Sequence, residues 1–382
     1  MRTPMGVYSS SSAGFKIARK KVAEFISKRD NVIANESNIY MTNGASEGCV
    51  LGLRLAVRNE KDAVLLPIPQ YPLYSAMMQL MNGKVLPYYL NEETDWSLKV
   101  EDIQMQIDMA RKQGITTRAI VVINPGNPTG QVVSEENIRS IIELCARENI
   151  MILADEVYQE NIWDKNLKFH SFRKVLETMP PHIANSVELL SVHSISKGMS
   201  GECGLRGGYF ETKNFLPEIE EVIAKLKAVE MCANTVGQIA CTLMVDPPKR
   251  GKESAETMAL FEREYAGIFE GMRDRAVLLS ERLNEMENIT CNKLQGAMYA
   301  FPRLHLGHKV IQKAQEQKVA PDFLYCWELL NATGVQTVPG SGFGQVEGTF
   351  HLRMTNLVSP TQKMAQTLEQ MADFNHKFNR KY

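Results

Sequence analysis

The sequence lacks an excess of charge of either sign. Its 43 Lys and Arg residues balance 44 Asp and Glu residues, which gives a formal net charge of −1. Nucleic-acid and membrane-surface binding depend on a basic face that neutralises phosphates, so we expect neither kind of partner. Hydrophobic residues make up 44% of the 382 positions, a proportion typical of a folded globular protein and not of a disordered chain. The length predicts about two domains.

The sequence also lacks a long uninterrupted apolar run. The longest uncharged stretch, residues 63–83, contains three prolines between positions 67 and 72. A membrane-spanning helix needs about 20 mainly apolar residues with their backbone hydrogen bonds satisfied within the helix. Closely spaced prolines are incompatible with such a helix, so no transmembrane segment is predicted.

Cysteine is sparse and odd in number. The seven cysteines include no Cys-x-x-Cys motif, so a disulfide framework is not expected. Reduced, structural thiols in a reducing compartment are the preferred interpretation. The pair His305 and His308 is the nearest approach to a metal-binding motif, but no Cys or acid cluster accompanies it, and no metal site is predicted.

Short apolar segments alternate with helical patterns along the first two thirds of the chain. Buried strands are predicted at residues 63–68, 119–123, 151–154 and 187–192. A helical pattern over residues 134–149 opens with Ser134 in the capping position. Short apolar strands separated by helices indicate a parallel sheet covered on both faces, which is an α/β fold.

The last third of the chain has a different pattern. Residues 216–245 are predicted to be mainly helical, and residues 246–254, with two prolines and a glycine, form a linker. A long helix over residues 255–286 follows, then short strands within residues 297–302, 334–340 and 350–355, and a final helix. We therefore predict a large domain over residues 1–245 and a smaller α+β domain over residues 246–382.

Three of the predicted strands end in distinctive polar groups. Asn127 lies in the NPGNPTG segment after the second strand, and Asp155 and Tyr158 follow the third. The fourth strand leads into a segment that carries Ser194, Ser196 and Lys197, with Arg206 nine residues after the lysine. Open parallel sheets bind ligands at the carboxyl ends of their strands, so these groups are expected to meet at one site.

This set of groups matches the chemistry of pyridoxal phosphate, which offers a carbonyl, a ring nitrogen that needs an acidic partner, a ring oxygen and a phosphate. Lys197 would form the imine and Asp155 would pair with the ring nitrogen. The ring oxygen would be bound by Tyr158 and Asn127, and the phosphate by Ser194, Ser196 and Arg206. Taken singly, each motif also fits an ordinary turn or helix cap. Their joint occurrence at strand ends favours the cofactor site.

The motifs NPGNPTG, ADEVYQ, SVHSISKG, GLRGGY and FHLRMT resemble those of fold-type I pyridoxal-phosphate aminotransferases over nearly the whole chain. The segment SKGMSGECGLRGGYFE is similar to the alanine aminotransferase branch. This resemblance implies a large domain built on a mostly parallel, seven-stranded type of sheet. It also implies ping-pong transfer of an amino group between L-alanine and 2-oxoglutarate, which gives pyruvate and L-glutamate.

The resemblance also assigns residues one at a time. It implies that Lys197 is the Schiff-base lysine, that Asp155 is the partner of the pyridine nitrogen, and that Tyr158 and Asn127 are partners of the ring oxygen. Further positions matching the family's motifs are the backbone amides of Ala45 and Ser46 for the phosphate, Tyr71 for stacking on the ring, Arg353 with Asn127 for the substrate, and Tyr8 for the cofactor phosphate of the other subunit. The match at Tyr8 implies a homodimer. The alternatives are a core tyrosine at position 71 and a structural ion pair at Arg353.

The beginning of the chain leaves alternatives open. Residues 1–23 are basic, contain four consecutive serines and lack acids, as organellar transit peptides do. We favour a loop followed by a helix over residues 16–28, because GVYSSSSAG resembles a segment inside the mature family members, although its Tyr8–Gly14 spacing is one residue longer. A cytoplasmic location is expected, with organellar targeting left open if residues precede Met1.

Family members carry a further stretch before the tyrosine that matches Tyr8. Without a counterpart, the strands near residues 297–301 and 350–354 are expected to lack a cover, and alanine turnover is expected to be feeble. Two rival hypotheses remain. One is a related pyridoxal-phosphate enzyme with another amino donor, and the other is a cofactor-binding chain with little activity.

Overall fold

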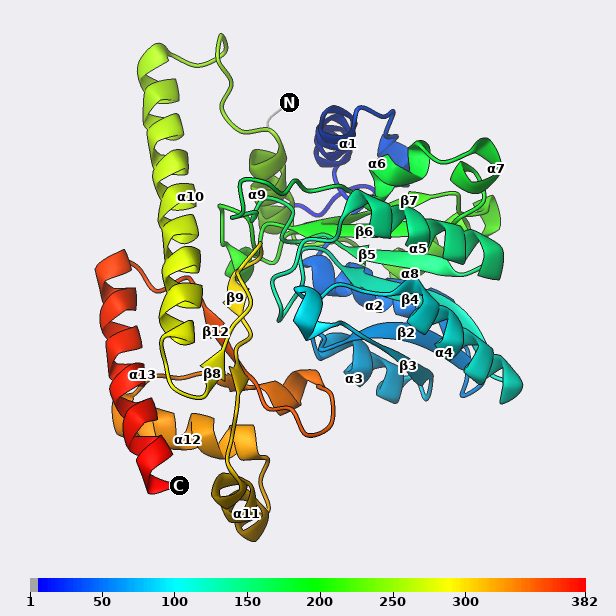
Figure 1. The fold of residues 1–382 in the computed structure, drawn as a ribbon. Helices are drawn as coiled ribbons and strands as arrows, with labels where there is room; N and C mark the ends of the chain where they lie inside the picture. The colour runs from blue at the N-terminus through cyan, green and yellow to red at the C-terminus, as the bar shows by residue number, and fades with distance from the viewer. Residues whose placement is uncertain (1–5) are drawn as a thin grey trace.

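The computed structural model describes residues 6–382 and centres on one seven-stranded sheet (Figure 1). In chain order its strands are β1 (Ile39–Thr42), β2 (Asp62–Ile68), β3 (Lys84–Tyr89), β4 (Thr116–Ile123), β5 (Met151–Asp155), β6 (Leu189–Ser194) and β7 (Gly208–Lys213). Across the sheet they lie in the order β1-β7-β6-β5-β4-β2-β3. Only β7 runs antiparallel to its neighbours among these strands. The predicted α/β fold with a mostly parallel sheet is confirmed.

Helices cover both faces of this sheet, as predicted for buried parallel strands. One face packs against α4 (Val100–Lys112), α5 (Glu135–Glu148), α6 (Phe172–Glu177) and α7 (Pro181–Ala184), and the other against α2 (Ala45–Ala56), α3 (Leu73–Leu80) and α8 (Pro217–Val229). At the β1 end, α1 (Lys16–Asp30) and α9 (Thr235–Val245) pack together. Side chains alternate between the faces there: Tyr40 and Phe210 face α2, while Ile39 and Tyr209 face α1.

The predicted helices form close to their expected bounds. Ser134 caps α5, where its hydroxyl oxygen accepts a hydrogen bond from the Asn137 backbone N–H at 3.1 Å. The predicted helical region 216–245 divides at residues 230–234, because Met231 adopts a left-handed conformation and Asn234 caps α9 by accepting from the Gly237 N–H at 2.6 Å. The linker 246–254 contains no helix, and the long helix that follows is α10 (Ala255–Asn284).

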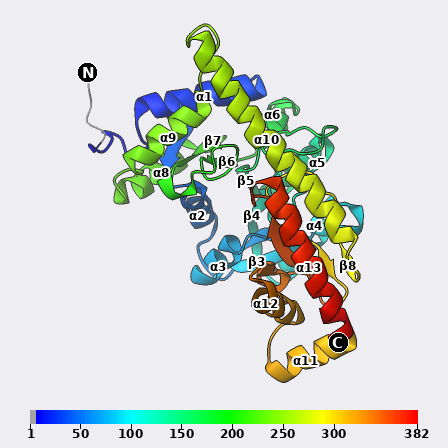
Figure 2. The same ribbon diagram turned by 90° about the vertical axis from the view of Figure 1, so that its left-hand side faces the viewer.

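Residues 289–381 form a second, smaller unit around α10 (Figure 2). Its helices are α11 (His308–Gln317), α12 (Pro321–Thr333) and α13 (Thr361–Lys381), and its strands are β8 (Ile289–Thr290), β9 (Tyr299–Ala300), β10 (Arg303–Leu304), β11 (Val338–Pro339) and β12 (Leu352–Thr355). The strands form a three-stranded sheet, β11-β12-β9, and a pair, β10-β8. Short 3₁₀ turns occur at Glu36–Asn38, Glu92–Thr94, Cys203–Leu205 and Gly340–Phe343.

The expectation that the small strands lack a cover is wrong. Ala297, Ala300 and Leu352 are fully buried and belong to one apolar core with side chains of α10 and α13. The two long helices lie side by side along this unit (Figure 2) and supply the cover that was thought to be missing.

The helix expected over residues 16–28 is confirmed: α1 starts at Lys16 and ends at Asp30. Residues 1–5 of the basic stretch lie outside the described residues. Within residues 6–382, no helix has the length and apolar character needed to cross a bilayer. The same residues contain no group of three or more His, Cys, Asp or Glu side chains placed to hold a metal ion, and the His305 ring is hydrogen-bonded to Thr290.

Candidate active site

A cavity of about 250 Å³ opens at the carboxyl ends of the parallel strands. Ten of the residues singled out from the sequence line it: Ala45, Ser46, Tyr71, Asn127, Asp155, Tyr158, Ser194, Ser196, Lys197 and Arg206. Arg353 lies at the rim of the cavity, where it is hydrogen-bonded to Asn127. Tyr8 lies outside the cavity, and 63% of its surface is exposed. The sheet therefore brings together groups that are separated by up to 161 positions along the chain.

The carboxylate at the end of β5 is buried and only partly satisfied. Asp155 Oδ2 accepts a hydrogen bond from the Tyr74 hydroxyl at 2.7 Å, and that hydroxyl also contacts the Cys49 Sγ at 3.3 Å. Asp155 Oδ1 is buried without a hydrogen-bond partner in the described residues. Burial raises the pKa of Asp155, opposed by the Tyr74 hydrogen bond, the Val157 backbone and the charge of Lys197. A buried, partnerless acceptor suits a positively charged N–H donor from a ligand.

An anion cradle lies at the N-terminus of α2. The Arg206 Nη2 donates to the Asn43 carbonyl at 2.8 Å and to the Ser46 Oγ at 3.2 Å. Gly44 caps the helix at φ 81°, and a Cβ there would lie 2.4 Å from the same guanidinium nitrogen, so the close approach requires glycine. Free backbone N–H groups and the helix dipole favour an anion at this end. The geometry suits a phosphate.

The lysine after β6 lies between two aromatic rings. Lys197 Nζ donates to the Tyr299 hydroxyl at 3.3 Å and lies 5.5 Å from the centre of the Tyr158 ring. The two tyrosine rings meet edge to face at 6.0 Å. Burial and the neighbouring Tyr299 raise the pKa of Tyr158 well above its ordinary value, so this hydroxyl keeps its proton and can donate.

Arg353, on β12, faces the cavity from the smaller unit. Its Nη1 donates to the Asn127 Oδ1 at 3.1 Å, and its guanidinium lies 4.2 Å from the Tyr299 ring centre and 4.8 Å from that of Phe343. No carboxylate within residues 6–382 forms an ion pair with it, so the alternative of a structural ion pair is wrong. The alternative of a core tyrosine at position 71 is also wrong, since Tyr71 is 40% exposed.

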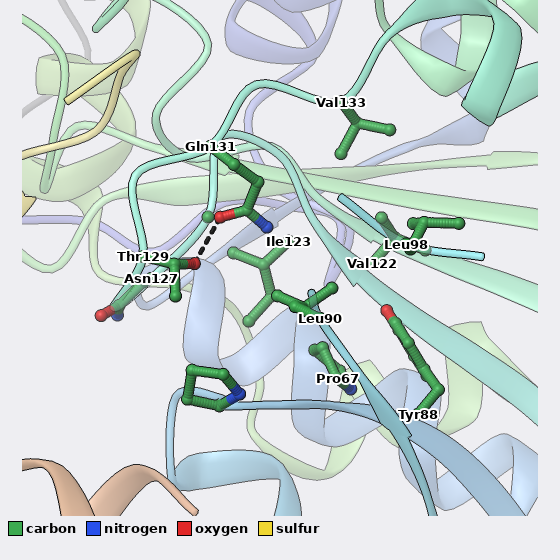
Figure 3. Close-up of a pocket in the computed structure, with 12 residues that line it drawn as sticks. Pro67, Tyr88, Leu90, Leu98, Val122, Ile123, Asn127, Thr129, Gln131 and Val133 are labelled. Carbon is green, nitrogen blue, oxygen red and sulfur yellow. Dashed lines mark hydrogen bonds between the residues drawn. The ribbon is translucent and has the colours of Figure 1, made fainter. Parts of the chain in front are cut away.

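The NPGNPTG segment has both a structural and a site-facing part. The Asn124 Oδ1 accepts from the Val133 N–H at 3.0 Å, and the Thr129 hydroxyl donates to Gln131 Oε1. Figure 3 shows Gln131 and Thr129 above an apolar floor at the edge of β4, while Asn127 points away from that floor. Turn chemistry therefore holds the loop so that Asn127 reaches the cavity.

Two of the residues that line the cavity, Cys49 and Tyr299, were not expected from the sequence, and neither was Tyr74, whose hydroxyl donates to Asp155. Tyr74 lies on α3 three residues after Tyr71, which precedes the helix, and the two rings meet edge to face with their centres 6.5 Å apart. Tyr299 lies in a predicted strand but carried no signal that distinguished it from a core residue. Their roles depend on packing between distant segments.

The donor set fits pyridoxal phosphate. A partnerless carboxylate oxygen, an anion cradle and a lysine surround one cavity, and each corresponds to one functional group of that cofactor. The arrangement is suited to reactions in which the amine of a substrate replaces the amine of a lysine on a carbonyl group.

Comparison with known proteins identifies aminotransferases as relatives of this chain. The family model described as aminotransferase class I and II matches residues 8–370. The chain is 46% identical to glutamate–glyoxylate aminotransferase 2 of Arabidopsis thaliana over 99% of this chain and 78% of that protein. It is also 46% identical to mitochondrial alanine aminotransferase 2 of the same species, over 98% and 68%.

Solved structures share the fold. An alanine aminotransferase from Pyrococcus furiosus has a TM-score of 0.80 at 24% identity, covering 98% of this chain and 84% of that one. An aminotransferase from Escherichia coli has a TM-score of 0.76 at 26% identity, covering 97% and 83%. With the cavity and its donor set in place, the chain belongs to the class I and II aminotransferases, a family of fold-type I enzymes that depend on pyridoxal phosphate.

Proposed function

We propose that this chain transfers an amino group between L-alanine and 2-oxoglutarate, giving pyruvate and L-glutamate in two half-reactions. The observation that carries the reaction type is the cavity that joins Lys197, Asp155 and Arg353. The amino donor is supported by 46% identity to an alanine aminotransferase and by the GECG segment. A second candidate, glutamate with glyoxylate, is supported by equal identity to a protein with that name.

When bound, pyridoxal phosphate supplies an electron sink for charge that develops at the substrate α-carbon. In our proposal Asp155 keeps the ring nitrogen protonated through its free Oδ1, while Tyr74 holds its other oxygen. Tyr158 and Asn127 bind the ring oxygen, and Tyr71 packs on the ring.

The phosphate ligands in this proposal are the backbone N–H groups of Ala45 and Ser46 with the side chains of Ser194, Ser196 and Arg206. Ser194 Oγ already accepts from the Ser196 N–H at 3.3 Å, which holds the two residues together. The guanidinium of Arg206 provides a planar fork for two phosphate oxygens.

Lys197 is the base in this proposal. Its Nζ would hold the cofactor through the carbonyl group, and as a free amine it would take the proton from the substrate α-carbon and later deliver it. Arg353 binds the α-carboxylate of amino acid and oxo acid alike, oriented by Asn127 and by the rings of Tyr299 and Phe343. Its position fixes which face of the α-carbon meets Lys197.

We further propose a homodimer, with Tyr8 reaching the other subunit, and a division of the chain into domains at residues 245 and 246. The exposure of Tyr8 outside the cavity agrees with a role at an interface. A cytoplasmic location is supported by the seven free cysteines, although some relatives are named mitochondrial. Sedimentation of the active protein tests the dimer, and an active monomer would contradict it.

The function is tested with the protein loaded with pyridoxal phosphate. L-alanine should change its visible absorbance, and added 2-oxoglutarate should restore the original spectrum with one equivalent of pyruvate formed. Replacing 2-oxoglutarate and alanine by glyoxylate and glutamate measures the second candidate by the same readout. If alanine leaves the spectrum unchanged while another amino acid alters it, the alanine assignment is wrong.

A further inference from the structure

Tyr299 lies at the meeting point of the two charged groups that act on the substrate. Its hydroxyl is 3.3 Å from Lys197 Nζ, and its ring lies 4.2 Å from the Arg353 guanidinium. It lines the cavity together with Tyr158. The hydroxyl of Tyr299 thus contacts the proposed base, Lys197, and its ring contacts the proposed carboxylate-binding group, Arg353.

The backbone around Tyr299 is held from two directions. In the small sheet Tyr299 is paired with Thr355, two residues after Arg353, so the ring and the guanidinium come from adjacent strands. On the other side, Gly130 of the NPGNPTG segment packs so closely that a Cβ there would lie 3.1 Å from the Tyr299 carbonyl oxygen. The backbone of Tyr299 is therefore held close to the NPGNPTG segment of the large sheet region.

The charges around the hydroxyl favour its acting as an acceptor. Burial alone would raise the pKa of Tyr299, but the Lys197 charge, a hydrogen bond from Tyr158 and the Arg353 charge together lower it. Tyr158 is the donor in that pair, because its own pKa is raised by burial and by Tyr299. The titratable groups that face Tyr299 are thus two cations and one donor hydroxyl.

We propose that Tyr299 is a further catalytic residue, whose hydroxyl oxygen accepts a hydrogen bond from the Lys197 nitrogen while that nitrogen carries the transferred proton. This inference rests on the proposed function of Lys197. The C–H bond at the substrate α-carbon would break and an N–H bond would form on Lys197, while the electron pair of the broken bond passes to the bound cofactor. The proton would later leave that nitrogen for the carbonyl-derived carbon of the cofactor. Tyr299 neither gains nor loses a proton over the cycle; it aims the nitrogen and stabilises its charged form.

The test compares Tyr299→Phe with Tyr299→Leu in the protein loaded with pyridoxal phosphate. Phe keeps the ring under Arg353 and removes only the hydroxyl, so kcat should fall by about tenfold to a hundredfold, as expected for loss of a hydrogen bond to a charged group. KM for alanine and 2-oxoglutarate should stay within about threefold, whereas Leu should raise both KM values because the platform under Arg353 is lost.

Two readouts separate a catalytic role from a structural one. The isotope effect of α-deuterated alanine on kcat should increase in Tyr299→Phe, because proton transfer becomes slower relative to other steps. The pH midpoint of the visible band of the bound cofactor should move by about half a unit or more. The second readout needs no turnover, so it reports on Tyr299 even if alanine proves to be the wrong substrate.

Tyr325→Phe is the matched control. It removes a buried hydroxyl of the same unit, which is bonded to Asn375 at 2.9 Å and lies outside the cavity lining. This variant should keep kcat, the isotope effect and the pH midpoint of the native protein. If Tyr299→Phe also keeps all three, or changes KM alone, Tyr299 only supports Arg353 and the proposal is overturned.

Discussion

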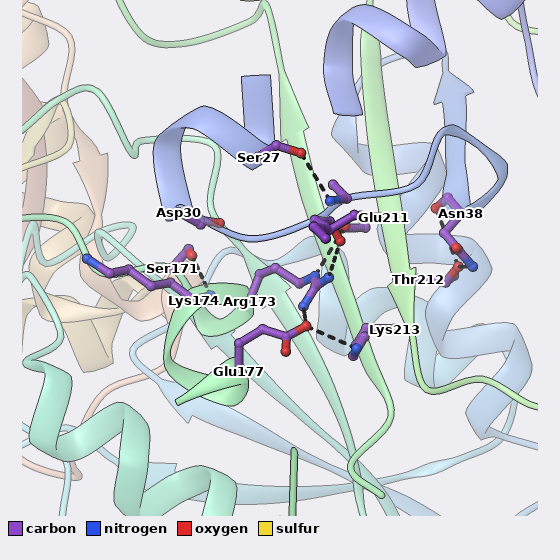
Figure 4. Close-up of polar contacts among 12 residues, drawn as sticks. Ser27, Asp30, Asn38, Ser171, Arg173, Lys174, Glu177, Glu211, Thr212 and Lys213 are labelled. Atoms are coloured by element: carbon purple, nitrogen blue, oxygen red, sulfur yellow. Dashed lines mark hydrogen bonds and ion pairs between the residues drawn. The ribbon is translucent and has the colours of Figure 1, made fainter. Parts of the chain in front are cut away.

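Two groups of charged side chains lie within the large sheet region, and their cations are partnered differently. On the α1 and α6 side, Arg173 lies between Glu211, at 3.3 Å, and Glu177, and Lys213 reaches Glu177 at 3.0 Å (Figure 4). We refer to these four residues as the Arg173 cluster. Each of its cations has a carboxylate from the same chain, although within residues 6–382 the second oxygen of Glu211 has no hydrogen-bond partner.

The cavity at the strand ends is built in the opposite way. Lys197, Arg206 and Arg353 donate to hydroxyl, carbonyl and amide oxygens, and none forms an ion pair within residues 6–382. Asp155 is the carboxylate among these site residues, so the three cations outnumber it and favour an anionic ligand. The comparison teaches that the cations of the cavity are available to a ligand, whereas those of the Arg173 cluster are neutralised within the chain.

The largest effect is expected from Lys197→Ala. The variant loses both the covalent attachment and the base, so alanine turnover should fall by about 10⁴-fold or more, and the visible band of the attached cofactor should disappear. Absorbance and coupled pyruvate assays measure both. Lys213→Ala, in the Arg173 cluster, is the control and should keep the band. A retained band in Lys197→Ala would assign the attachment to another lysine.

Arg173→Met should lower the free energy of unfolding and leave the catalytic rate unchanged. Arg173 is 4% exposed, and its loss leaves Glu211 buried without a cation, at a cost of about 3–5 kcal/mol. The denaturant midpoint should fall accordingly, while kcat of the folded protein stays near normal. Lys174→Met, the next residue on α6, is the matched control and should cost under about 0.5 kcal/mol. A normal midpoint in Arg173→Met would show that the cluster contributes nothing.

Glu156 tests the contrast from within, since it follows Asp155 but is aimed toward Arg29 and not into the cavity. Burial raises its pKa from the ordinary 4.5 to about 8, opposed by Arg29 and the Phe172 N–H. Between these values the folded chain binds more protons than the unfolded chain, so stability should fall as pH rises toward 8. The loss is up to about 1.4 kcal/mol per pH unit.

Glu156→Gln removes this titration. In the native chain the free energy of unfolding should be larger at pH 6 than at pH 8. This difference, measured by denaturant titration, should be about 2–3 kcal/mol smaller in the variant. The exposed Glu264→Gln is the control and should keep the native difference. An unchanged pH dependence in Glu156→Gln would show that Arg29 keeps this carboxylate ionised.

The smallest effect is expected from Arg353→Lys. A point charge replaces a planar fork, so KM for alanine and for 2-oxoglutarate should each rise by about tenfold. Steady-state kinetics in both directions measure this. Arg303→Lys, on the neighbouring β10, should leave both values unchanged. An effect on one substrate alone would contradict binding of the shared α-carboxylate.

Much of the sheet and of the site could be predicted from the sequence. The four apolar runs became β2, β4, β5 and β6, because buried parallel strands need side chains that suit two covered faces. Asp155 and Lys197 were placed at one site because parallel strands end at one edge. Both inferences needed local pattern and topology alone.

The missed elements depend on partners that are distant in the sequence. Strand β7 begins at Gly208 and ends in Glu211, Thr212 and Lys213, which look like a solvated turn. In the fold Glu211 Oε1 accepts a hydrogen bond from Arg173 Nε at 3.3 Å, and the Thr212 hydroxyl donates to Glu220 at 2.6 Å. Tyr74 and Tyr299 were missed for the same reason, since docking of α3 brings Tyr74 to Asp155 and docking of the small sheet brings Tyr299 to Lys197.

Helix α10 has a mechanical consequence. Its 30 residues span about 45 Å at 1.5 Å per residue, so a tilt of about 5° moves one end by roughly 4 Å. Its C-terminal half is tied to the strand of Arg353: Arg275 Nε donates to the Asn356 carbonyl at 2.7 Å, and Asn356 Nδ2 donates to the Met272 carbonyl at 3.0 Å. Because these two hydrogen bonds join α10 to the residue that follows β12, a tilt of the helix would shift the strand that carries Arg353.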